Sequence, residues 1–154
     1  MHGRIFEIRE ERLPREKWLN ESSFYEEETG SWCDWMCDSE DRKEDLDWLK
    51  SALPSSIFKV RGGVIEVISD GKEYIEEWIE RLKKQIGELT TEKAKTSSAV
   101  HSIKRNLEDM IDADFMFYTD YTPCPHLSTE FIRDCINNYQ GKKLYVCGII
   151  DYHY

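Results

Sequence analysis

IFKVRGGVIEVIS, residues 57 to 69, is the stretch that decides the fold. Two runs rich in β-branched residues flank Gly62 and Gly63, and β-branched side chains favour extended strands. Glycine readily adopts the positive φ angles that a tight hairpin turn requires. The stretch therefore predicts two antiparallel strands joined by a short turn, and with them a sheet.

The residues that follow this hairpin form the strongest helical pattern in the chain. Large apolar side chains recur there at a helical spacing, on one face: Tyr74, Ile75, Trp78, Ile79, Leu82, Ile86 and Leu89. Asp70 followed by Glu73 fits a capping box at the start of this helix. The polar stretch 90–98 predicts a turn. A second helix follows it, with apolar positions Val100, Ile103, Leu107 and Ile111.

Shorter patterns complete the architecture. We expect further strands at residues 3–8, 115–118 and 144–154, and further helices at about 14–24, from Asp38 or Ser39 to about Ala52, and from Ser128 to a stop at Gly141. About five strands and five helices in this order predict a single α+β domain over residues 1–154, with a mainly antiparallel sheet and helices packed on one face. No glycine-rich loop joins a strand to a helix, so no nucleotide-binding loop is predicted.

The stretch SWCDWMCDSED, residues 31 to 41, is the most unusual in composition. If it is helical, Trp32, Trp35 and Met36 form one stripe that faces the core, and Cys33 and Cys37 share a neighbouring face. Two such thiols could hold zinc only with two more ligands, and Cys124 and His126 are the nearest in type. Structural zinc pairs are usually spaced more tightly than this. We therefore expect reduced, packed thiols and neither a metal nor a cofactor.

Acidic residues are concentrated in one block of the chain. The net charge is −10, and residues 26–47 alone hold ten acidic and two basic side chains. A net negative charge of this size argues against direct nucleic-acid binding, which depends on clustered Lys and Arg. Such a block can be a solvated surface that keeps the protein soluble. Trp32, Trp35 and Trp48 lie in or beside the block, however, and aromatic anchors among charges are typical of the centre of an interface.

We therefore expect a non-enzymatic protein-interaction module in which an acidic surface acts as a nucleic-acid mimic. It would inhibit a basic protein partner, such as a nucleic-acid enzyme, by occupying its basic surface. The residues expected to contact the partner are Glu26, Glu27, Glu28, Trp32, Asp34, Trp35, Asp38, Glu40, Asp41, Glu44 and Asp45. In size, acidity and tryptophan content the chain is similar to bacterial immunity proteins and phage-encoded anti-defence inhibitors, a similarity of composition alone.

Two other interpretations stay open. The chain could be a small-molecule-binding or catalytic α+β domain with a pocket near Cys124, His126 and Tyr121, although it carries no diagnostic catalytic motif. It could also be an acidic subunit of a larger assembly. No run of apolar residues is long enough to cross a membrane, and no secretory signal is recognisable at the N-terminus. We expect a cytoplasmic protein without membrane contact, and the sequence does not predict its oligomeric state.

Overall fold

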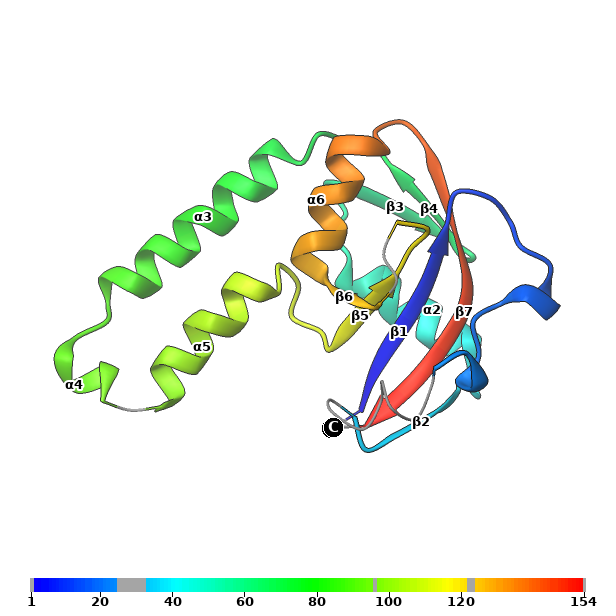
Figure 1. The fold of residues 1–154 in the computed structure, drawn as a ribbon. Helices are drawn as coiled ribbons and strands as arrows, with labels where there is room; N and C mark the ends of the chain where they lie inside the picture. The colour runs from blue at the N-terminus through cyan, green and yellow to red at the C-terminus, as the bar shows by residue number, and fades with distance from the viewer. Residues whose placement is uncertain (1, 25–32, 96, 122–123, 154) are drawn as a thin grey trace.

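The computed structural model describes residues 2–24, 33–95, 97–121 and 124–153. A seven-stranded sheet lies at its centre, with the order β3-β4-β7-β1-β5-β6 and with β2 also paired to β7 (Figure 1). The strands are β1 (His2–Arg9), β2 (Trp35–Asp38), β3 (Phe58–Arg61), β4 (Val64–Val67), β5 (Phe115–Tyr118), β6 (His126–Leu127) and β7 (Lys143–His153). Within the described ranges, β1 and β5 pair in parallel, and the other pairs are antiparallel.

The helical elements confirm the α+β class but not a single layer of helices. They are the 3-10 turns η1 (Arg15–Lys17) and η2 (Glu21–Ser23), and the helices α2 (Arg42–Ala52), α3 (Lys72–Gly87), α4 (Thr91–Ala94), α5 (Ser97–Glu108) and α6 (Ser128–Asn138). The hairpin of α3 and α5 projects away from the sheet, so the predicted packing of all helices on one face is not confirmed (Figure 1). Over the described ranges, none of the helices combines the length and apolarity that a membrane crossing needs.

The main core lies on the face of the sheet that α2 and α6 cover. Phe6 on β1 and Phe115 and Phe117 on β5 point to this face, where each is almost completely buried. The ring of Phe131 on α6 stacks on Phe117, with 4.0 Å between centroids, and Trp48 on α2 meets Phe115 edge-on at 4.7 Å. Burying each such ring contributes roughly 1.5–3 kcal/mol, so these contacts fix both helices on the sheet.

The opposite face of the sheet is covered by the segment that was predicted to be a helix at 14–24. Leu19 and Phe24 pack there against a small cluster that contains Ile5 and Ile150. The helix prediction is wrong because tertiary contacts use the polar groups of this segment. The Leu19 amide donates to a side chain of β1, and Pro14 begins only a 3-10 turn.

The stretch around residues 35–38 is a strand and not a helix. Met36 packs in the small cluster, whereas Trp35 and Cys37 point to the other face, as alternation along a strand requires. The next helix begins at Arg42, and its N-cap is Asp41 rather than Asp38 or Ser39. It ends at Ala52, as predicted. The sheet has seven strands, whereas about five were predicted. The two strands that were not predicted are β2 and β6.

Three other predicted boundaries differ in detail. The N-cap of α3 is Gly71, with φ 66°, and the capping box of Asp70 and Glu73 does not form. The predicted turn 90–98 contains α4, a single helical turn. The hydroxyl of Ser128 bonds to Asp109 instead of capping α6, which ends three residues before Gly141, at Asn138.

Candidate functional site

The described part of the acidic block, residues 33–47, is attached to the centre of the sheet through β7. On one side β7 pairs with β1, and on the other it pairs first with β4 and then with β2. Arg42 fills the interval between these two short strands: its guanidinium donates to the carbonyl oxygens of Val146, at 2.7 Å, and Cys147. The same group stacks on the ring of Trp18 at 4.5 Å. Because Arg42 is turned toward the sheet, it does not neutralise the acidic side chains exposed around it.

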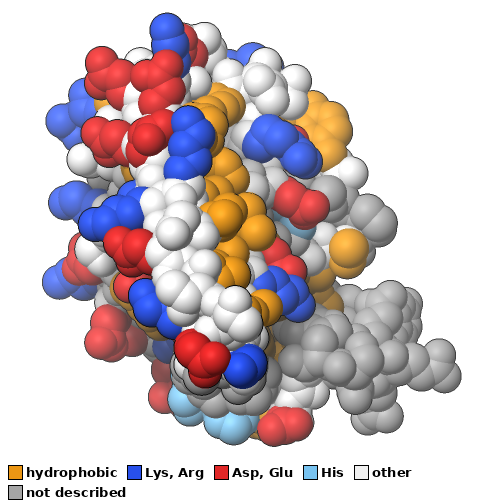
Figure 2. Space-filling view, turned by 90° about the vertical axis from the view of Figure 1, so that its left-hand side faces the viewer, with side chains coloured by type: hydrophobic (Ala, Val, Ile, Leu, Met, Phe, Trp, Pro, Cys, Tyr) orange, Lys and Arg blue, Asp and Glu red, His pale blue; other side chains and the backbone are white. Residues whose placement is uncertain are grey.

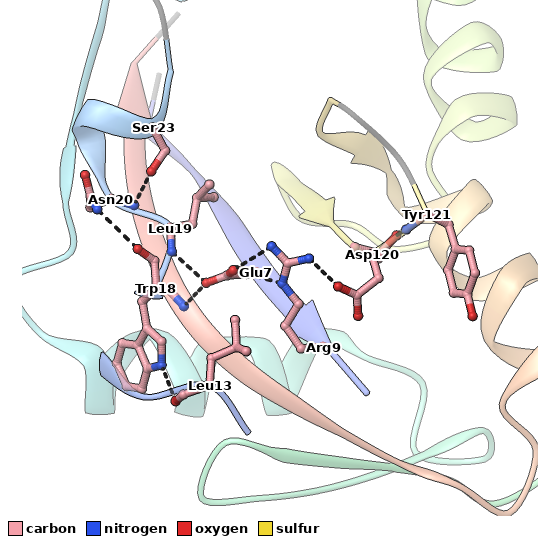
Figure 3. Close-up of polar contacts among 11 residues, drawn as sticks. Glu7, Arg9, Leu13, Trp18, Leu19, Asn20, Ser23, Asp120 and Tyr121 are labelled. Carbon is pink, nitrogen blue, oxygen red and sulfur yellow. Dashed lines mark hydrogen bonds and ion pairs between the residues drawn. The ribbon is translucent and has the colours of Figure 1, made fainter. Parts of the chain in front are cut away.

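A buried carboxylate holds the cover of the opposite face in place (Figure 3). Oε2 of Glu7 accepts hydrogen bonds from the amides of Leu19 and Gly148, each at 2.8 Å. Oε1 of Glu7 accepts from Arg9, whose guanidinium also bonds to Asp120. Glu7 is only 1% exposed, and every oxygen of its carboxylate has a partner. This network belongs to the framework of the fold, because the carboxylate is buried and its oxygens are fully used in holding β1, β7 and the covering segment together.

Two indole rings are exposed together on the α2 face of the sheet. Trp35 is 49% exposed and meets His2 edge-on at 6.3 Å, and Trp48 is 37% exposed with the guanidinium of Arg4 at 5.6 Å. His2 and Arg4 are alternate residues of β1, so their side chains lie on the same face of the sheet. The two indoles are therefore presented on one side of the molecule.

Two carboxylates accompany these rings. Asp34 precedes Trp35, its side chain is 79% exposed, and its oxygen lies 3.7 Å from Nδ1 of His153. Glu44 is exposed one helical turn before Trp48 and therefore on the same side of α2. We call Asp34, Trp35, Glu44 and Trp48 the indole surface. Aromatic rings beside acidic groups are a composition typical of protein-binding surfaces.

Other members of the predicted site have different positions. Asp45 is 3% exposed and pairs with Arg4 at 2.7 Å, so it is not a surface charge. Asp38 is exposed on the sheet face opposite Trp35, and its oxygen accepts from the amide of Glu21. Asp41 is exposed and accepts from the amide of Glu44 as the cap of α2. The block is thus divided between two faces and the interior of the protein.

The remaining predicted residues complete this account. Glu40 is exposed in the connection between β2 and α2. Four predicted contact residues lie outside the described residues: Glu26, Glu27, Glu28 and Trp32.

The alternative pocket near Tyr121 offers very little space. Tyr121 is 68% exposed, and its hydroxyl bonds to Glu10 at 2.7 Å. The hollow beside it holds about 10 Å³, the space of one water molecule, whereas sites for small molecules need hundreds of Å³. Cys124 is exposed, but His126 is buried opposite Phe117, and burial lowers the pKa of its imidazole. Of these three residues, Tyr121 alone is among the described residues that line this hollow.

The cysteines of the acidic stretch are poorly suited to nucleophilic or metal chemistry. Burial raises the pKa of the Cys33 thiol. Burial likewise raises the pKa of Cys37, and the negative charge of Asp151 adds to the effect. Both environments favour the neutral thiol over the reactive thiolate. In the part of the chain that the structure describes, no three or more His, Cys, Asp or Glu side chains are grouped to hold a metal ion.

Sequence patterns do not reveal the basic groups that gather around Trp18. A hollow of about 330 Å³ is lined by Arg15, Trp18 and Arg42 together with polar groups of the neighbouring turns. A second hollow of about 250 Å³ adjoins Arg12, Trp18 and Arg42. These arginines come from two separate segments, so only the folded chain brings them together. We assign these arginines no ligand.

Comparison of the chain with protein-family models, with curated proteins and with solved structures found no match. Function is therefore inferred from the geometry of the chain itself.

Proposed function

We propose that this protein binds a partner protein with a basic surface and that the indole surface forms the centre of the contact. The observation that carries the proposal is the exposure of Trp35 and Trp48 on one face, beside the carboxylates of Asp34 and Glu44. Indole rings supply large, rigid contact areas, and carboxylates beside them select a cationic counterpart.

The electrostatics of the chain support this choice of partner. Two more carboxylates are exposed nearby, Asp47 on α2 and Glu40 between β2 and α2. The net charge of −10 also accelerates encounter with a positive surface at low salt. A basic groove that binds nucleic acid is one such surface. In occupying it, the protein would act as an inhibitor that mimics nucleic acid, in the cytoplasm. Asp38 and Asp45 have no part in the contact proposed here.

Variants that alter the indole surface without altering the fold test this proposal. The set is Trp35→Ala, the double charge reversal Asp34→Lys/Glu44→Lys, and the control Glu88→Lys/Glu92→Lys. The control changes the net charge by the same amount on exposed residues near the tip of the projecting hairpin. Each is immobilised, and proteins captured from cell extract are quantified at about 50 and 300 mM salt, between which screening increases strongly.

We expect the wild type and the control to capture the same basic proteins at low salt. Trp35→Ala and the Asp34/Glu44 double variant should each lose capture by about tenfold, which corresponds to about 1.4 kcal/mol of binding free energy. Equal capture by all four proteins would contradict the proposed surface. Equal loss in the control would show that only net charge matters.

A further inference from the structure

The α3–α5 hairpin is a two-helix layer held together by polar contacts along its length. The hydroxyl of Tyr74 donates to the carbonyl of Met110 at 2.6 Å, and the indole N–H of Trp78 donates to the carbonyl of Asn106 at 2.9 Å. The side chain of Asn106 also bonds to Gln85 at 3.0 Å. These contacts show the antiparallel arrangement: Tyr74, near the start of α3, contacts Met110, just after the end of α5, and Asn106 is contacted by both Trp78 and Gln85.

Both helices of this hairpin leave large aliphatic side chains exposed. Ile79 and Ile86 on α3 are 37% and 53% exposed, and Val100 and Leu107 on α5 are 49% and 47% exposed. We call these four residues the hairpin stripe. Within each helix the two residues are seven apart, which is about two turns, so they lie on the same side.

Helix geometry places all four residues on one side of the hairpin. In α3 the stripe lies about 110° clockwise, seen from the N-terminus, from the side that carries Tyr74 and Trp78. In α5 it lies about as far clockwise from the side that carries Asn106. Because the helices run in opposite directions, these two rotations lead to the same face. Figure 2 shows a continuous apolar stripe with charged side chains along its margins on this side of the molecule.

We propose that the hairpin stripe is the contact between two copies of this chain. The two hairpins pack face to face through their stripes and form an antiparallel four-helix bundle. A continuous exposed apolar row with charged margins is typical of an association surface. The proposal does not depend on the function proposed above, because it uses a different surface.

The spacing of the stripe is self-complementary. The midpoint between Ile79 and Ile86 falls at residues 82–83, and the midpoint between Val100 and Leu107 falls at residues 103–104. The polar contacts between the helices place these two midpoints within about two residues, or roughly 3 Å, of the same level of the hairpin. A twofold axis through that level pairs Ile79 with Ile86 of the second copy and, at the same time, Val100 with Leu107 of the second copy. Such a contact is isologous and closed.

The charges of the hairpin favour a second copy over a strongly charged partner. Residues 72–108 carry eight basic and seven acidic side chains, whereas the whole chain has a net charge of −10. The margins of the stripe carry pairs of opposite sign within the chain, including Glu80 with Lys83 at 2.7 Å and Lys104 with Glu108 at 3.6 Å. The antiparallel arrangement also places the two acidic bodies at opposite ends of the contact, which limits their repulsion.

The mass of the protein in solution tests the proposal directly. Sedimentation equilibrium or light scattering at about 1 to 100 µM, where mass action governs dimer formation, should give twice the 18.3 kDa of one chain at the upper concentrations. Ile86→Glu and Leu107→Glu place a carboxylate in the stripe at exposed positions, so each should raise the dissociation constant more than tenfold. The control Lys84→Glu, on the side of α3 that faces away from the hairpin stripe, should stay dimeric.

A crosslinking variant tests the register. Val100→Cys/Leu107→Cys, made with Cys124→Ser to remove an exposed native thiol, should form a disulfide between copies on mild oxidation. Within one chain the two positions are about 10 Å apart along α5, too far to be joined. A monomeric wild type at every concentration would overturn the proposal. Dimers that survive both Glu substitutions would place the contact elsewhere, and absence of the crosslink in a dimeric variant would overturn the register.

Discussion

Replacing Glu7 by glutamine changes little in shape and much in hydrogen bonding. Both carboxylate oxygens act only as acceptors: Oε1 faces the Arg9 guanidinium, at 2.8 and 2.9 Å, and Oε2 faces the amides of Leu19 and Gly148, each at 2.8 Å. A glutamine side chain has one accepting oxygen and one donating NH₂ group. Whichever way the amide is turned, the NH₂ group meets donors, and Arg9 loses one of the two carboxylates that it pairs with.

The size of the effect follows from the burial of this network. Removing one partner of a buried ion pair costs about 3–5 kcal/mol of unfolding free energy. The side chain of Arg9 is 19% exposed and keeps its bond to Asp120, so water and that carboxylate compensate for part of the loss. We therefore expect Glu7→Gln to lower the free energy of unfolding by about 3 kcal/mol, at the lower end of that range.

Urea denaturation followed by tryptophan fluorescence measures this change. With a denaturant slope of about 2 kcal/mol per M, the midpoint should fall by about 1.5 M. The matched control is Glu11→Gln, at an exposed residue just beyond β1, which should change stability by less than about 0.5 kcal/mol. Hydrogen exchange of the Leu19 and Gly148 amides should also accelerate in Glu7→Gln. A variant as stable as the control would refute the role assigned to this carboxylate.

Three further substitutions probe the core and its titration. Gly148→Ala would drive a Cβ into a backbone carbonyl of the covering segment and should cost about 1–3 kcal/mol by urea denaturation, whereas Gly87→Ala, where the added atom meets nothing, should be neutral or stabilising. Phe131→Ala removes a ring stacked at 4.0 Å and should cost about 3–5 kcal/mol in the same assay. Burial lowers the pKa of His126 in the folded protein, so the unfolded chain binds more protons below pH 6.5, and stability should fall as pH drops from there, by at most about 1.4 kcal/mol per pH unit. His126→Asn should show a shallower dependence between pH 7.5 and 5.5, and an unchanged slope in thermal denaturation would contradict this assignment.

Local patterns predict the elements whose structure depends on neighbouring residues. Gly62 and Gly63 have φ angles of 51° and 80°, as the predicted hairpin turn requires, and they connect β3 to β4. The apolar period of residues 74–89 corresponds to α3, since residues three and four apart meet on one side of a helix without help from distant segments.

Contacts between distant segments decide what the patterns could not show. The local sequence of residues 35–38 does not decide between a helix and a strand. Pairing with β7, at the far end of the described chain, makes this segment a strand. In the sequence Asp45 is one acid among ten, but in the fold it is the buried partner of Arg4. The sequence therefore indicated which kinds of residue to consider, acids beside tryptophans, but not which of them the fold places on one surface.

The placement of β1 beside β7 has a consequence for the nascent chain. These strands are the first and last of the described elements in chain order, and they lie next to each other in the middle of the sheet. On the ribosome β1 can pair with β5, but its other edge stays open until β7 emerges, whereas the α3–α5 hairpin needs only local contacts. Sheet closure thus waits for the synthesis of β7, and a chain stalled before residue 143 leaves Ile5 and Phe6 accessible to chaperones.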